Sequence, residues 1–364
     1  MKRIINVVGA RPNFMKIGPI QREMAKYPNE IEPLLLHTGQ HYDEKMSKLF
    51  FVDLELPQPD IYLGVGSGSH AQQTAKIMTD FEKVCLEHKP DMVLVVGDVN
   101  STVACSLVAS KLHIPVIHVE AGLRSNDRKM PEELNRLVTD VLSDHLFITE
   151  KSGIENLKNE GIDDSKVHFV GNVMIDSLAY NAKKADESKI LDQLELESGN
   201  YVLVTLHRPS NVDDPENFMK IIRAFEEVPK DLQIVFPMHP RTANNIKKFG
   251  LEERVAALTN LKQLPPIGYL DFMQLTRNSK FVMTDSGGIQ EETTYLGIPC
   301  ITLRENTERP ITAEVGTNEI VGTDMDLILN CLERVLSGNW KKGEIPELWD
   351  GKAAERIVSV LRKL

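Results

Sequence analysis

The sequence has few cysteines and no long apolar run. Without a CxxC pair it has neither a zinc knuckle nor a dithiol redox motif, and each thiol lies in an apolar context typical of a core. The four cysteines are Cys85, Cys105, Cys300 and Cys331. No stretch reaches the roughly 18 apolar residues of a membrane span, and the short N-terminal run reads as a strand and not a signal peptide. These absences predict a soluble, cytoplasmic protein that does not enter a membrane.

Positive charge is not in excess. Lysine and arginine number 42 against 53 aspartate and glutamate residues, which gives a net charge of −11. No nucleic-acid partner is expected, because duplex binding requires a concentrated basic face. A local basic pocket for a small anion remains compatible with this charge.

Length and composition fit a globular protein with two domains. The chain has 364 residues, and a domain has roughly 150 residues. Hydrophobic residues make up 41% and charged residues 26%, which excludes a disordered or collagen-like chain. Two hydrophobic cores are therefore expected.

Short runs rich in valine, isoleucine and leucine alternate with helical stretches. The runs show no polar alternation, as expected of parallel strands covered on both faces. The strands expected in the first half are 3–8, 33–36, 92–96, 115–119, 145–148 and 167–170, and the helices 13–26, 70–88, 101–112, 131–142 and 151–160. This order predicts a doubly wound α/β domain.

The same order of elements restarts in the second half. Strands are expected there at 201–206, 232–236, 261–264, 280–284 and 299–302. The predicted fold class is α/β, with two doubly wound Rossmann-like domains facing a central cleft. The expected parts are 1–171, 172–345 and a C-terminal helical segment, 346–364, that packs back on the first domain. Ligands of open parallel sheets bind beyond the carboxyl ends of the strands, so the strand-to-helix turns are the expected site.

The first turn, GARPNFMK, carries two cations. It has neither the GxGxxG spacing of a dinucleotide site nor a P-loop, so neither NAD nor ATP is predicted. Gly9, a helix start and the side chains of Arg11 and Lys16 suit a pyrophosphate. The alternative is an ordinary turn with two solvated cations.

Acidic residues follow the next strands of the first half. Asp98 comes directly after a buried strand, and Glu120 interrupts an apolar strand at its carboxyl end, where a charge needs a partner or a task. Glu132 and Glu133 open the following helix, where the helix dipole alone would favour acids, so either one could be structural. Separate helix caps would explain each turn singly, but the convergence of all three at one sheet edge favours acid/base chemistry.

The second half presents histidines and a glycine turn. His207 follows a strand and suits proton donation or phosphate contact, or could simply bond a loop carbonyl. His239 and Arg241 end the next strand as another pair of a histidine and an arginine. Ser286, Gly287 and Gly288 precede a helix and would expose backbone N–H groups to a phosphate. Further along, Glu292 could accept hydrogen bonds from a ribose, and Arg309 follows the next strand. The pattern describes a nucleoside diphosphate site.

At these positions the chain closely resembles the non-hydrolysing UDP-N-acetylglucosamine 2-epimerases, which share the two-domain architecture of glycosyltransferase B proteins. The match preserves motif order over nearly the whole chain. Its segments are GARPNFMK (9–16), TGQH (38–41), GDVNST (97–102), HVEAGLR (118–124), PEELNR (131–136), HRPSN (207–211), HP (239–240), DSGGIQEE (285–292) and TERP (307–310). The resemblance implies interconversion of UDP-GlcNAc and UDP-ManNAc, without NAD or a metal and usually in a homodimer.

The resemblance also implies roles for single residues. Asp98, Glu120 and Glu132 look like the family's acid/base carboxylates, and His207 like a histidine near the leaving UDP. The implied substrate or UDP contacts are Arg11, Lys16, Arg136, His239, Ser286, Gly287, Gly288, Glu292 and Arg309. Since the C2 proton is not beside a carbonyl, the expected route is loss of UDP with that proton to give a glycal, followed by re-addition.

Other readings share parts of this pattern. An epimerase for a modified sugar, such as a UDP-diacetamido uronate, would keep all the named motifs. A glycosyltransferase of the same architecture would share the nucleotide half but would not obviously need three acids in the first domain. A nucleotide-sugar sensor would be free to lose those acids, and this chain retains them.

One segment departs from the resemblance. Bacterial members that are activated by a second UDP-GlcNAc carry arginines after the early strand and in the following loop. This chain keeps Gln40 and His41, a remnant of that second site, but has Tyr42 and the segment GSGSHAQQ (66–73) without arginine. Substrate activation is therefore not expected, because an arginine is a bidentate phosphate partner.

Overall fold

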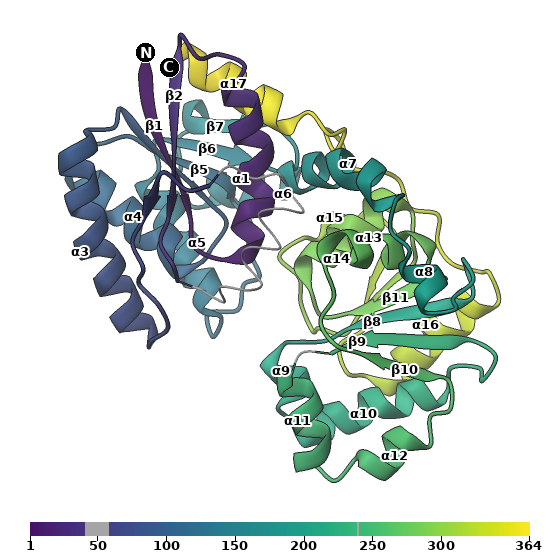
Figure 1. The fold of residues 1–364 in the computed structure, drawn as a ribbon. Coiled ribbons are helices and arrows are strands. Elements are labelled where there is room, and N and C mark those ends of the chain that lie inside the picture. The colour runs from purple at the N-terminus through teal and green to yellow at the C-terminus, as the bar shows by residue number, and fades with distance from the viewer. Residues whose placement is uncertain (41–57, 239) are drawn as a thin grey trace. The chain divides into compact units, whose positions relative to one another are not determined.

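The computed structural model describes residues 1–40, 58–238 and 240–364. The chain divides into two compact units, one of Met1–Tyr180 with Glu347–Leu364 and the other of Asn181–Pro346. Each unit is built on one parallel sheet with helices packed on it (Figure 1). The expected pair of α/β domains is therefore confirmed.

The sheet of the first unit is entirely parallel among the described residues. Its strands are β1 (Lys2–Val8), β2 (Ile31–His37), β3 (Ile61–Tyr62), β4 (Met92–Val96), β5 (Val116–Ala121), β6 (His145–Ile148) and β7 (Val167–Phe169). They lie in the order β3-β2-β1-β4-β5-β6-β7. The carboxyl ends of β1, β4 and β5 therefore lie next to one another at one edge of the sheet.

Helices cover both faces of this sheet. They are α1 (Arg11–Met24), α3 (His70–His88), α4 (Asn100–Lys111), α5 (Pro131–Leu142), α6 (Lys151–Asn159), α7 (Val173–Ala185) and α17 (Ala353–Lys363), with a 3₁₀ turn at Asp164–Lys166. Val7, Phe81 and Ala104 belong to a core that joins the sheet to α3 and α4. On the other face α1 lies beside α17 (Figure 1).

The C-terminal segment is held to the first unit by polar contacts. The carboxylate of Asp176 accepts hydrogen bonds from the amides of Ala353 and Ala354 at 3.1 and 2.8 Å, at the start of α17. The buried Trp349 donates its indole N–H to the Thr149 carbonyl at 3.0 Å. These contacts tie α17 to residues more than one hundred positions earlier in the chain.

The second unit has its own parallel sheet. The strands are β8 (Tyr201–Thr205), β9 (Gln233–Pro237), β10 (Leu261–Leu264), β11 (Phe281–Thr284), β12 (Cys300–Thr302) and β13 (Asn318–Ile320). Their order is β10-β9-β8-β11-β12-β13. In this sheet β8 and β11 are neighbours, so the turns that follow them are adjacent.

Two cores cover the faces of the second sheet. The helices are α8 (Ile190–Gln193), α9 (Pro209–Val212), α10 (Pro215–Glu226), α11 (Pro240–Lys248), α12 (Glu252–Ala256), α13 (Tyr269–Asn278), α14 (Gly287–Leu296), α15 (Ile311–Glu314) and α16 (Met325–Leu336). On one face Phe225 of α10 meets Phe236 of β9 edge to face, with ring centroids 6.0 Å apart. On the other face Leu203 packs with Leu275 of α13.

The observed elements differ from the expectation at short strands and at one boundary. The edge strands β3 and β13 have two and three residues, too few to give a sequence pattern of their own. The division between units falls between Tyr180 and Asn181, inside helix α7, whereas the expected boundary preceded that helix. A single helix thus runs from one unit into the other.

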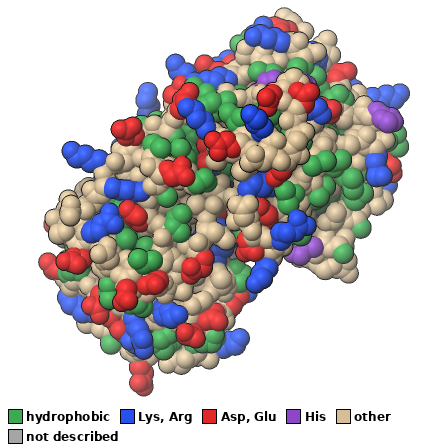
Figure 2. All heavy atoms as spheres, turned by 180° about the vertical axis from the view of Figure 1, so that it is seen from behind, with side chains coloured by type: hydrophobic (Ala, Val, Ile, Leu, Met, Phe, Trp, Pro, Cys, Tyr) green, Lys and Arg blue, Asp and Glu red, His purple; other side chains and the backbone are tan. Residues whose placement is uncertain are grey.

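The cysteines lie in the cores, and charged side chains of both signs lie on the surface (Figure 2). The four cysteines are buried free thiols. On the face drawn in Figure 2, basic and acidic side chains are interspersed and do not gather into fields of one sign. Every helix that the structure describes falls short of the length and apolarity that a bilayer span requires.

Candidate active site

The turn after β1 is fixed to the end of β4 by one asparagine. The side-chain oxygen of Asn13 accepts hydrogen bonds from the amides of Gly9 and Ala10 at 3.1 and 3.0 Å. Its side-chain nitrogen donates to the Val96 carbonyl at 3.1 Å. The first helix therefore starts at a set position against the neighbouring strand.

Three turns of the first unit meet at Gly97. This residue has a φ of +66°, and a Cβ built on it would lie 2.9 Å from Lys16 Nζ and 3.3 Å from Glu120 Oε2. The two charged groups form an ion pair, and both side chains are buried. Gly97 thus leaves the space in which a cation of the first turn reaches an acid of the third.

Glu120 occupies a strained position. Its φ is +70°, in a region that a non-glycine residue rarely adopts. The pairing of β5 with β6 shifts register between Val119 and Ala121, so Glu120 sits on a bulge at the end of the strand. Such strain costs on the order of 1–3 kcal/mol and is concentrated at functional positions. The bulge is what lets this carboxylate meet Lys16.

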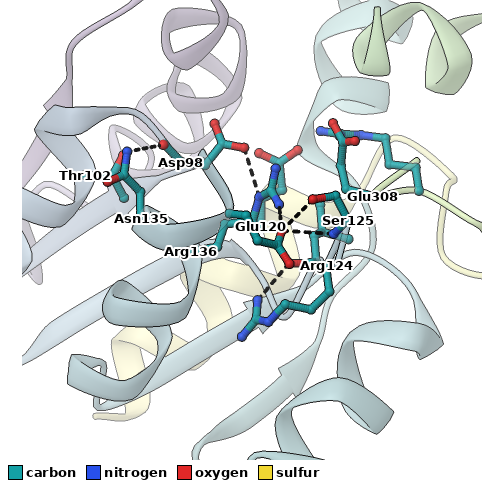
Figure 3. Close-up of polar contacts among 12 residues, drawn as sticks. Asp98, Thr102, Glu120, Arg124, Ser125, Asn135, Arg136 and Glu308 are labelled. Atoms are coloured by element: carbon teal, nitrogen blue, oxygen red, sulfur yellow. Dashed lines mark hydrogen bonds and ion pairs between the residues drawn. The ribbon is translucent and has the colours of Figure 1, made fainter. Parts of the chain in front are cut away.

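Asp98 is held by two residues of α5. Its Oδ2 accepts a hydrogen bond from Arg136 Nε at 3.0 Å, and its backbone carbonyl accepts one from Asn135 Nδ2 at 2.8 Å (Figure 3). Arg136 is buried, whereas the Asp98 side chain is 26% exposed. A carboxylate that an arginine holds in place therefore remains accessible at this turn.

The two acids that open α5 have different environments. Glu133 is buried and accepts hydrogen bonds from Ser125 N and Oγ at 2.9 Å and from Asn126 N at 3.0 Å, and it pairs with Arg136. Its carboxylate fixes the loop before the helix. Glu132 is half-buried, and among described residues no hydrogen bond or ion pair engages its carboxylate. Of the two, Glu133 is the structural residue and Glu132 is available for chemistry.

The remaining predicted residues of the first half lie on or near α1 and β2. Arg11 is the first residue of α1. Gln40 is buried, and its side-chain oxygen accepts hydrogen bonds from Ser101 N and Oγ at 2.9 and 2.7 Å. His41, and His239 of the second half, lie outside the described residues.

In the second unit a buried aspartate orients His207. Asp285 Oδ1 lies 3.0 Å from His207 Nδ1, and Asp285 also accepts the amides of His207 and Arg208 at 3.1 and 2.9 Å. Burial opposes ionisation of Asp285, but hydrogen bonds from His207, Arg208 and Asn211 outweigh it and hold its pKa below the ordinary value. The His207 side chain is 54% exposed. Its Nε2 is therefore the atom available to a ligand.

The start of α14 follows the neighbouring strand. Ser286 is its N-cap residue, and the first N–H groups of a helix have no acceptor within the helix. A Cβ on Gly287 would lie 2.8 Å from both Arg309 Nη1 and Glu308 Oε1, so glycine is needed for these side chains to reach the turn. With Gly288 behind it, this turn can receive an anion.

Glu292 and Arg309 belong to one buried charged group. Arg309 pairs with Glu291 at 2.7 Å and with Glu308 at 2.7 Å. Burial, with the charge of Glu291 beside it, raises the pKa of Glu292 to about 8. Arg309 is thus balanced by two carboxylates, and Glu292 is mostly protonated at neutral pH.

Two residues that hold the candidate site in place have partners far away in the sequence. Asp285 stands in the DSGG segment, but its partner His207 is 78 positions earlier and only the pairing of β8 with β11 brings them together. Asn13 lies in the first turn of α1, and its bond to the Val96 carbonyl joins residues 83 positions apart. An acid directly after a buried strand was the available signal for Asp285.

Comparison with known proteins gives the family. The family model described as UDP-N-acetylglucosamine 2-epimerase matches residues 23–362. A UDP-N-acetylglucosamine 2-epimerase homolog of Methanococcus maripaludis is 45% identical over 100% of both chains. A UDP-2,3-diacetamido-2,3-dideoxy-D-glucuronate 2-epimerase of Pseudomonas aeruginosa is 39% identical over 100% of both. The crystal structure of Methanocaldococcus jannaschii UDP-GlcNAc 2-epimerase in complex with UDP-GlcNAc and UDP is 42% identical, with a TM-score of 0.89 over 100% of both chains. The chain belongs to the UDP-N-acetylglucosamine 2-epimerase family.

Proposed function

We propose that this protein interconverts UDP-GlcNAc and UDP-ManNAc by inverting C2 of the sugar. The observation that carries the proposal is the meeting of Lys16, Glu120 and the Asp98 turn around Gly97, with Glu120 on a strained bulge. Carboxylates of this kind can remove and return a proton at carbon.

The reaction proceeds by elimination and re-addition. A base takes the C2 proton, the C–H electrons form a C1–C2 double bond, and UDP leaves from C1 with the electrons of the C1–O bond. UDP then re-adds to the 2-acetamidoglucal as a proton is delivered to the opposite face of C2. Inversion therefore needs acid/base groups that serve two faces, and atoms balance without a redox step.

The first unit supplies those groups. Glu120 lies beside Lys16 and Asp98 beside Arg136, so each of these two carboxylates is held in place by a cation. Glu132 is the third candidate carboxyl group, and no cation among the described residues is paired with it. We assign no carboxylate to a particular face of C2.

The second unit supplies diphosphate and ribose contacts. The amides at the start of α14, from Ser286 to Gly288, would bind the departing diphosphate, and His207 Nε2 would stabilise or protonate it. Glu292 would bond the ribose. Arg309 would contribute positive charge only to the extent that its pairing with Glu291 and Glu308 allows.

A second substrate is supported by one relative. The Pseudomonas aeruginosa protein is named for a diacetamido uronate, and an enzyme for that sugar could share all residues named above. Proton NMR of each UDP-sugar with the purified protein separates the two cases. We expect UDP-GlcNAc to reach equilibrium with UDP-ManNAc at the higher kcat/KM, and turnover of the uronate alone would contradict this assignment.

We also propose that two copies associate through α5. Leu134, Val138 and Val141 lie on one stripe of this helix at 40, 44 and 64% exposure. These side chains are neighbours on the helix surface, and their burial against the same stripe of a second copy would remove them from water. Sedimentation analysis of wild type and Val141→Lys tests it: a dimer that Val141→Lys dissociates is expected, and an unchanged mass for the two proteins would contradict it.

A further inference from the structure

A buried histidine lies beneath the turns of the first unit. His118 is on β5, and its side chain is fully buried. Its Nδ1 is 2.6 Å from Asp140 Oδ1 of α5, and its Nε2 is 2.8 Å from the carbonyl oxygen of Gly97. The ring therefore spans from a helix to the residue that precedes Asp98.

Both neighbours of the ring are acceptors. A peptide carbonyl can only accept, so Nε2 must carry a hydrogen to bond Gly97. Asp140 Oδ2 accepts the Gly122 amide at 3.1 Å and lies 2.7 Å from Arg124 Nη2, so this carboxylate is ionised and Nδ1 must carry a hydrogen too. Burial disfavours the negative charge of Asp140, but His118 and Arg124 outweigh this effect and hold the pKa of Asp140 below its ordinary value.

The charges around the ring balance. Arg124 also pairs at 2.6 Å with Glu160, the residue that follows α6, so His118 and Arg124 face Asp140 and Glu160. The other charged groups described near Gly97 are Lys16 with Glu120, and Asp98 with Arg136, and each of these cations pairs with its acid. A protonated His118 is therefore compensated by an anion in direct contact.

We propose that His118 is a positioning residue that is held as an imidazolium and ties Asp140 to the carbonyl of Gly97. Through this bridge one helix residue fixes two turns. The Gly97 carbonyl belongs to the peptide bond that leads into Asp98, and Asp140 holds the amide of Gly122, two residues after Glu120. His118 does not touch the substrate and acts through the placement of these two carboxylates.

The first test reads the charge directly and is independent of activity. In the full-length protein with ¹⁵N-labelled histidine, both ring nitrogens of His118 should give the shift of a protonated nitrogen at about pH 7.5, where a free histidine is mostly neutral. The signal that is missing from the spectrum of His118→Gln is thereby assigned to His118. In Asp140→Asn, which removes the anion, one nitrogen should become unprotonated. An unprotonated nitrogen in wild type, or an unchanged imidazolium in Asp140→Asn, would overturn the inference.

The second test separates positioning from stability. His118→Gln should lower kcat for epimerisation by about 100-fold, because a displacement of about 1 Å can cost that much, while KM stays unchanged. The matched control is His168→Gln, which replaces a half-buried histidine on β7 of the same sheet, outside the network, and should leave kcat unchanged. Equal kcat values for the two variants would overturn the positioning role.

The inference rests on the proposed epimerase function, and the two can fail separately. If wild type does not epimerise UDP-GlcNAc, the proposed function fails while the NMR signature still decides the charge of His118. If wild type is active but His118 is neutral, only this inference fails. Should His118→Gln not fold, Asp140→Asn supplies the assignment and the kinetic comparison.

Discussion

Neighbouring glutamates on α14 should have opposite effects on stability. Glu292 is buried and mostly protonated, because burial and the charge of Glu291 raise its pKa to about 8. Glu291 instead pairs with Arg309 at 2.7 Å. Replacing each by glutamine keeps the shape and removes the ability to ionise, so the two variants form a matched pair.

The magnitude for Glu292 follows from proton linkage. The ordinary pKa is 4.5, so between that value and about 8 the folded protein retains a proton that the unfolded chain has released. The contribution of Glu292 to the free energy of unfolding is therefore fully present below pH 4.5 and is lost as the pH rises from 4.5 through about 8. At pH 7 the loss is about 3 kcal/mol and at pH 5 about 1 kcal/mol. Glu292→Gln should therefore stabilise the second unit, and more at pH 7 than at pH 5.

The matched variant should act in the other direction. Glu291→Gln leaves the buried Arg309 with one carboxylate fewer, and breaking a buried pair costs about 3 kcal/mol. Each unit contains one tryptophan, Trp340 in the second and Trp349 in the first. Urea unfolding followed by ¹⁹F NMR of fluorotryptophan protein therefore reports the two units separately. Stabilisation that does not grow with pH, or an equal shift for both variants, would refute this reasoning.

Two further changes probe the site. Gly122→Ala should destabilise the first unit by about 3 kcal/mol, because φ is +76° and the new Cβ would lie 2.7 Å from the Gly153 carbonyl. The control is Gly161→Ala, which has a similar φ of +79° but open space around it and should cost about 1 kcal/mol; equal urea midpoints for the two variants would contradict this. Lys16→Met should lower kcat more than tenfold and lower the free energy of unfolding by about 3 kcal/mol, because Glu120 is left buried without its cation. Epimerisation rates and urea unfolding test this with Lys16→Arg as the control, and a wild-type kcat in Lys16→Met would contradict a role for the ion pair.

The fold could be predicted because its main strands are buried on both faces. Runs such as Met92–Val96 and Tyr201–Thr205 are continuous and apolar, so they identify a parallel sheet from local sequence alone. The edge strands β3 and β13 could not be predicted, because so few residues form a strand only when a neighbouring strand is present. Helix α7 gives no local sign that it crosses between units.

The site could be predicted in part for a related reason. Asp98 and Glu120 could be identified as candidates because burying an acid at the end of an apolar strand costs free energy unless the acid has a partner or a task. The partners of such acids depend on contacts across the fold. Lys16, for which a UDP contact is expected, also pairs with Glu120, 104 positions away, and the local sequence gives no sign of that pair. Local sequence could not distinguish Glu132 from Glu133 either, since only the bonds to Ser125 and Asn126 identify the structural one.

Exchange at C2 in deuterated water tests the central claim most directly. Wild-type protein incubated with UDP-GlcNAc should place deuterium at C2 of both epimers and release little free UDP, because the C2 proton is taken up and replaced from solvent. Glu120→Gln should abolish this exchange while UDP still binds to the second unit. The account is contradicted if UDP-ManNAc forms without deuterium at C2, if free UDP and ManNAc accumulate, or if UDP-GlcNAc binds and does not react.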